Sequence, residues 1–188
     1  TVTGVQTCAL PIWAILQSGS ANFVSSRARA TDVAEGFLRE LGLRFQEAVQ
    51  LNHLPVSELL DAQTRVAAWV SGRDDGLPFQ PVVDGEVLPC SPFEAIAGGS
   101  ARDVELLIGT NLDEMKLFGL RDPEGRSLDR ERLLDRCRRR IPGSESLAAR
   151  IVETYKQARA SRGETTSPPE LWSAIDTDKT FRHPAMLL

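Results

Sequence analysis

The sequence predicts an α/β protein that is rich in helices and contains only a few strands. Its strongest strand signal is Val104–Ile108, a run of aliphatic and β-branched residues typical of a parallel strand buried on both faces. Gly109 ends this run, and a polar loop with the adjacent acids Asp113 and Glu114 follows. In open α/β sheets the ligand crevice lies beyond the carboxyl ends of the strands. The order of strand and loop therefore predicts a functional site here.

Two helices are predicted in the first half of the chain. Thr31 can cap the first helix and Gly42 can end it. The second helix starts near Pro55 and precedes a charged loop that follows Gly72. The apolar faces consist of Val33, Ala34, Phe37, Leu38 and Leu41 in the first helix, and of Leu59, Leu60, Val66, Ala67 and Trp69 in the second. Both helices are expected to bury these faces.

A turn signal lies at Asp84–Gly85, where the glycine can adopt a positive φ angle. Residues 81–89 around it are predicted to form a hairpin with a two-residue turn. Residues 92–98 are predicted to form one short helix. The chain offers few parallel partners for the strand at 104–108 beyond the segment at 14–17.

Three further helices are predicted after the acid loop. Leu128–Ile141 and Ser146–Ala160 have helical spacing, and Pro142–Gly143 separates them. Ser167 and two prolines precede a last helix that contains Trp172. The first of these helices carries the arginines Arg130, Arg132, Arg136, Arg138, Arg139 and Arg140, interleaved with Asp129, Glu131 and Asp135. Such mixed charges are typical of a solvated helix surface, so no nucleic-acid partner is expected.

The composition indicates an ordinary soluble globular protein and no particular partner. The chain has 188 residues, of which 41% are hydrophobic and 26% charged, with a net charge of −4. The cysteines at 8, 90 and 137 have neither metal-ligand spacing nor a disulfide framework, so no metal or cofactor is expected. The apolar run interrupted by Pro11 is too short to span a membrane. These features do not assign the protein to a cellular compartment.

The acid loop has two interpretations on its own residues. Asn111 or Asp113 can cap a helix that Met115 continues, with Glu114 favouring the first turn of that helix. Alternatively, one of the two adjacent acids serves catalysis at the end of the strand.

A wider set of segments bears on this choice. They are AILQSGSAN at 14–22, ELG at 40–42, LPVSELLDAQ at 54–63, PVVDGEVLP at 81–89, LLIGTNLDE at 106–114 and TDKTFRHPA at 177–185. In sequence, order and spacing the chain resembles the type B carboxylesterase family of α/β hydrolases, which includes the cholinesterases. The resemblance covers most of the chain from Ala14 onward. It implies a partial α/β-hydrolase fold, the central and C-terminal part, that is helix-rich with a few sheet strands.

The resemblance also implies roles for individual residues. The family uses a Ser-His-Glu or Ser-His-Asp triad, and its acid is the last residue of the GTNxDE loop, which here is Glu114. This acid would hold a histidine in the correct tautomer and stabilise the imidazolium that forms during catalysis. Ser18 matches a family serine that supports the acid and is not the nucleophile. Asp113 is the weaker choice for the acid.

The other catalytic parts of the family are missing from the sequence. No serine lies in a G-x-S-x-G turn, where the family keeps its nucleophile. His183 follows Glu114 in the correct order, but it occupies a position that the family does not fix, and His53 precedes a helix as a structural or surface residue. These absences indicate an internal piece of a longer enzyme.

The first residues have a different expected origin. Val2–Ile12 matches the translation of a common short-read sequencing adapter, and one leftover base would explain Trp13. Residues 1–13 are therefore expected to be a non-native segment, and residues 14–188 to be the partial hydrolase domain.

Three hypotheses for function follow. The first is a fragment of a serine carboxylic-ester hydrolase that acts on small-molecule esters without a cofactor. The fragment alone would be inactive and would aggregate or stay partly unfolded, because its strands expose unpaired edges. The second is a non-catalytic cholinesterase-like binding or adhesion protein. The third is a self-contained helical domain with one hairpin.

Overall fold

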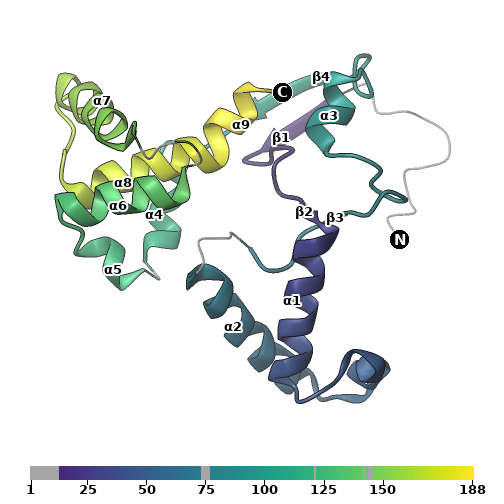
Figure 1. The fold of residues 1–188 in the computed structure, drawn as a ribbon. Helices are drawn as coiled ribbons and strands as arrows, with labels where there is room; N and C mark the ends of the chain where they lie inside the picture. Colours follow the sequence, from purple (N-terminus) through teal and green to yellow (C-terminus); the bar gives the residue numbers. More distant parts are fainter. Residues whose placement is uncertain (1–12, 73–76, 121, 142, 144–145) are drawn as a thin grey trace. The chain divides into compact units, whose positions relative to one another are not determined.

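The computed structural model describes residues 13–72, 77–120, 122–141, 143 and 146–188. The expected adapter-derived residues 1–12 lie outside this part of the chain. The chain divides into two compact units, Asn22–Glu94 and the remainder, which joins the segment ending at Ala21 to Ala95–Leu188. Each unit is described by itself below, with the element labels of Figure 1.

A short parallel sheet lies in the unit that contains both chain ends. Its strands are β1 (Trp13–Gln17) and β4 (Glu105–Gly109), which pair in parallel from Trp13 opposite Glu105 to Gln17 opposite Gly109. Figure 1 shows the two strands side by side. The predicted strand is thus confirmed with a shift of one residue, and the segment at 14–17 is its partner.

The prediction that this strand is buried on both faces is wrong for the described residues. In this strand Leu106 and Leu107 are 37% and 66% exposed, and in its partner β1 Trp13 and Ile15 are 69% and 67% exposed. A parallel strand is buried only where helices cover both faces of its sheet. In the described part of this unit the sheet has two strands, and the helices after β4 pack mainly on one another.

Those helices form the main hydrophobic core of this unit. They are α4 (Glu114–Gly119), α5 (Pro123–Arg126), α6 (Arg130–Arg140), α7 (Ala148–Ser161), α8 (Pro168–Thr177), the π-helical η2 (Asp178–Arg182) and α9 (His183–Met186). The core is made of Leu128, Leu133, Cys137, Ala148, Val152, Leu171, Trp172 and Ile175. The three helices predicted after the acid loop are confirmed as α6, α7 and α8.

Helix α6 differs from its predicted form in two respects. It begins at Arg130 because the Asp129 carboxylate accepts a hydrogen bond from the Arg132 N–H at 2.8 Å and caps the helix. Its arginines are not all solvated. The guanidinium carbon atoms of Arg136 and Arg140 lie 5.8 and 5.7 Å from the centre of a Trp172 ring, and these two side chains are partly buried. Two of the six arginines therefore pack within the unit.

The other unit is built on α1 (Arg27–Glu40) and α2 (Val56–Gly72), with the 3₁₀ helix η1 (Phe45–His53) between them. The prediction that Thr31 caps α1 is wrong. Ser26 is the cap, and its side chain accepts a hydrogen bond from the Arg29 N–H at 3.2 Å. The Thr31 hydroxyl bonds within the helix to the Arg27 carbonyl instead. Gly42, with φ of 68°, follows the end of α1 as predicted.

The core of this unit lies between the two helices. Val33, Val66 and Val70 are buried, and Phe37 and Trp69 pack against them. The apolar face predicted for α2 is wrong at the start of the helix. Leu60, which was predicted to be buried, is 53% exposed, whereas Ala62, which was not predicted, is fully buried.

The predicted hairpin at residues 81–89 is absent from the described structure. Strand β3 (Val82–Val83) pairs in parallel with β2 (Ser25–Ser26). The Asp84 carboxylate accepts hydrogen bonds from the N–H groups of Glu86 and Leu88 at 2.9 and 3.0 Å. These donors would be needed by a returning strand, so the segment folds into a loop instead. Gly85 has the expected positive φ, 83°.

The predicted short helix is confirmed as α3 (Pro92–Ala97). Ser91 and Glu94 cap it reciprocally, since each side chain accepts a hydrogen bond from the other residue's N–H, at 3.2 and 2.9 Å. Among the described helices, none combines the length and the apolar character that a membrane crossing requires.

Candidate functional site

The candidate site lies where the two parallel strands end. Gln17 at the end of β1 is opposite Gly109 at the end of β4. The Ser18 N–H continues this pairing by donating to the Gly109 carbonyl at 2.8 Å. Because parallel strands end at the same edge of a sheet, the loop at Ser18 and the loop that leads to Glu114 meet there, although they are 96 residues apart.

Ser18 has an unusual backbone conformation at this point. Its φ angle is 58°, and it is the non-glycine residue with positive φ among those described. This left-handed region is unfavourable for residues with a Cβ atom, and such strain is frequent at functional sites. Its half-buried side chain donates a hydrogen bond to Oε1 of Glu114.

The carboxylate of Glu114 is the centre of the cluster. Its Oε1 accepts hydrogen bonds from the Ser18 hydroxyl, from the Asn111 N–H at 2.8 Å and from the Asn111 side-chain amide at 3.0 Å. The Ser18 hydroxyl, followed by the Asn111 N–H, lowers the pKa of Glu114 below its ordinary value of 4.5, and these hydrogen bonds outweigh the opposing effect of burial. The group is therefore an ionised carboxylate at neutral pH.

The interpretation of the acid loop as the start of a helix is confirmed in part, because Glu114 lies in the first turn of α4. Asp113 occupies the cap position of α4, but its side chain makes no capping hydrogen bond and instead lies 3.3 Å from the Lys116 ammonium group. Asn111 is not the cap, and its amide turns toward Glu114. The sequence placed Asn111 either near the ligand crevice or at the helix cap, and did not predict its contact with Glu114.

An open cavity adjoins the cluster. Its volume is about 600 Å³, and it is lined by Ile15, Leu16, Gln17, Ser18, Leu107, Ile108, Gly109, Thr110 and Asn111. The lining comes from both strands and from the loops that follow them. The arrangement provides a mostly apolar surface beside an ionised carboxylate.

Neither histidine contributes to this cluster. Within the described residues, the hydrogen bonds to Glu114 come from Ser18 and Asn111. His183 is an exposed residue at the start of α9, and His53 is an exposed residue at the end of η1. The prediction that His53 is a surface or structural residue agrees with this position.

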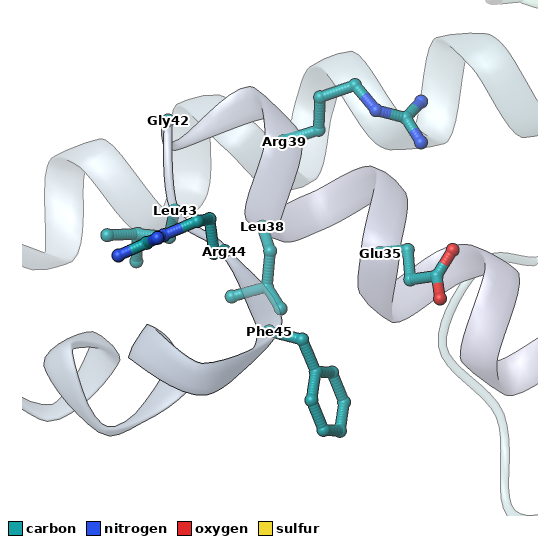
Figure 2. A pocket seen from close by; sticks show the side chains of 7 residues that line it. All are labelled: Glu35, Leu38, Arg39, Gly42, Leu43, Arg44 and Phe45. Carbon is teal, nitrogen blue, oxygen red and sulfur yellow. The ribbon is translucent and has the colours of Figure 1, made fainter.

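A second hollow lies within the unit of α1 and α2. It has a volume of about 410 Å³ and is lined by Glu35, Leu38, Arg39, Gly42, Leu43, Arg44 and Phe45 (Figure 2). Arg44 is bound to the Glu47 carboxylate at 2.9 Å. No serine, cysteine or histidine is among the lining residues, so this hollow offers no nucleophile. In the described part of the chain, no three metal-ligating side chains are grouped together.

Comparison with known proteins decides the family. The model of the carboxylesterase family matches residues 10–188. The chain belongs to this family. The para-nitrobenzyl esterase of Bacillus subtilis (strain 168) is 30% identical over 149 residues, which are 79% of this chain and 29% of that protein. The acetylcholinesterase of Danio rerio is 32% identical over 130 residues, which are 65% of this chain and 20% of that protein.

Solved structures agree with the predicted fold class. A carboxylesterase of Geobacillus stearothermophilus superposes with a TM-score of 0.72 at 32% identity, over 93% of this chain and 34% of that one. The chain thus spans about a third or less of the length of these relatives. The predicted partial α/β-hydrolase fold is confirmed, as a helix-rich carboxylesterase-family chain with few strands.

Proposed function

We propose that this chain is part of a serine carboxylic-ester hydrolase in which Glu114 is the acid of a Ser-His-Glu triad. The observation that carries the proposal is the distribution of hydrogen bonds on its carboxylate. Oε1 accepts from Ser18 and Asn111, whereas no hydrogen bond reaches Oε2 from the described residues. One oxygen anchors the side chain, and the other is available to accept from the N–H of a histidine.

The proposed role follows from this geometry. A histidine that donates its Nδ1–H to Oε2 is held in the tautomer whose Nε2 can take the proton of a serine hydroxyl. The lowered pKa keeps Glu114 ionised, so that it also stabilises the imidazolium as the serine attacks the ester carbonyl. Water then releases the acyl group from the serine. Ser18 and Asn111 would restrain the acid without reacting.

The serine and the histidine are proposed to come from sequence beyond these 188 residues. No serine here lies in a G-x-S-x-G turn, and His183 does not contact Glu114. The substrates would be small-molecule carboxylic esters, as the names of the related esterases suggest. A non-catalytic binding protein is less well supported, because it would have no need of an anchored, ionised acid at the strand ends.

This proposal is tested with variants of the longer protein, which is expressed from the source gene together with the coding sequence that flanks these 188 residues. Glu114→Gln should lower kcat on a para-nitrophenyl ester by about 10⁴, the effect of the equivalent change in a serine protease triad. Asp113→Asn, which removes the neighbouring charge, should change kcat little. The 188-residue chain alone should show no serine-dependent hydrolysis. Activity of that chain, or full turnover by the Glu114→Gln variant, would refute the proposal.

A further inference from the structure

Helix α4, which carries Glu114, is capped by a side chain of a helix that is distant in sequence. Its own cap residue, Asp113, makes no side-chain capping bond. The Met115 N–H in the first turn instead donates to the hydroxyl oxygen of Thr177 at 3.1 Å, across 62 residues of sequence. Early N–H groups of a helix have no partner within the helix, so this hydroxyl satisfies one of them.

The side chain of Thr177 is buried and held in place by its surroundings. It is the last residue of α8 and is 0% exposed. Leu171 and Ile175 of the same helix are 3% and 2% exposed and belong to the core with α6 and α7. A buried, β-branched side chain on a packed helix has little freedom to move, so its hydroxyl oxygen is a rigid acceptor.

Helix α4 depends on its tertiary contacts, which are mainly with α8. It has six residues, and Leu117 and Phe118 are 69% and 52% exposed. A helix this short is not stable by itself and depends on tertiary contacts. A second polar contact with α8 is the ion pair of Lys116 with Glu170, 3.1 Å apart and partly exposed, and such pairs stabilise little. The bond to Thr177, whose acceptor residue is fully buried, is therefore the stronger of these two polar contacts.

We propose that Thr177 is a positioning residue that fixes the first turn of α4 and thereby holds the Glu114 carboxylate against Ser18 and Asn111. Met115, whose N–H it binds, is next to Glu114 in sequence. The proposal rests on the proposed function for the catalytic meaning of Glu114. The positioning itself can be measured without any activity.

The measurement is made on the longer protein used for the activity test. Labelling methionine with nitrogen-15 gives an amide signal for Met115, which is assigned by its disappearance in Met115→Leu, and a reference signal for Met186 in α9. The variants to compare are Thr177→Val, which removes the acceptor, and Thr177→Ser, which keeps it. Thr154→Val is the matched control, because the Thr154 hydroxyl bonds within α7 to the Arg150 carbonyl at 2.8 Å.

Two results are expected for Thr177→Val. The Met115 amide should shift and exchange with solvent about tenfold faster, the order expected for one lost hydrogen bond. The titration midpoint of Glu114, followed through the adjacent Met115 signal, should rise toward its ordinary value as the contacts of Glu114 with Ser18 and Asn111 loosen. Thr177→Ser and Thr154→Val should keep the wild-type signal and midpoint, and Met186 should be constant throughout.

Three outcomes would overturn the proposal: an unchanged Met115 amide in Thr177→Val, a changed amide with an unchanged Glu114 midpoint, or a Thr177→Ser variant that behaves like the valine variant. If circular dichroism shows that Thr177→Val does not fold, Thr177→Ser decides alone, since retention of the wild-type signal and midpoint supports the proposal and their loss refutes it. A failure of the triad assignment would appear only in the kcat of Glu114→Gln, so the two results are separable.

Discussion

Leu133 provides a quantitative test of the core formed by α6, α7 and α8. It is 1% exposed and packs in one cluster with Trp172 and Ile175. Leu133→Ala removes three carbons, which costs about 2.4 kcal/mol of transfer free energy at about 0.8 kcal/mol per methylene. The remaining cavity adds to this cost. The free energy of unfolding should therefore fall by about 3 to 4 kcal/mol, within the range of roughly 2 to 5 kcal/mol measured for such changes.

The matched control is Leu117→Ala, the same deletion at a helix residue that is 69% exposed. Its cost should be below about 0.5 kcal/mol, because little apolar surface leaves a packed environment. Urea unfolding followed by circular dichroism would compare the two variants with the unchanged sequence, all three in the longer protein used for the activity test. Equal losses in both variants, or no loss in Leu133→Ala, would refute the packing described for this cluster.

Two other predictions concern charge and exposed apolar surface. Asp176 is 1% exposed, and burial raises the pKa of its carboxyl above 3.8, so the folded state holds this proton more tightly than the unfolded state does. The stability that the protonated Asp176 contributes is therefore complete below the unfolded pKa and is lost as pH rises through the folded pKa. Asp176→Asn should abolish this decline and raise the urea midpoint at neutral pH. An unchanged or lower urea midpoint would contradict this prediction. Ile15 and Leu107 are opposite each other in the sheet and are 67% and 66% exposed, so the double change to lysine should reduce aggregation of the isolated chain in light scattering. Leu112→Lys, at a loop leucine that is 71% exposed, should reduce it less, and equal effects would show that the sheet is not the cause.

Much of the fold could be predicted from sequence, because its signals are local. The apolar run before Gly109 identified β4, and helical spacing identified α2, α6, α7 and α8. The failures occurred where local alternatives compete. Ser26 and Thr31 are both good capping residues, and only the packing of α1 decides where that helix begins. The turn at Gly85 suits a hairpin, but the Asp84 carboxylate takes the N–H groups that a returning strand needs.

The sequence by itself determined that a strand ends in a polar loop with an acid, and its resemblance to the carboxylesterases pointed to Glu114 within that loop. Only the tertiary structure decided what holds this acid. Ser18 and Thr177 are 96 and 62 residues away from the residues that they bind, and no local pattern marks either contact. The physical reason is that caps, turns and periodicity depend on neighbours within a few residues, whereas these contacts exist only once β1 pairs with β4 and α8 packs into its core.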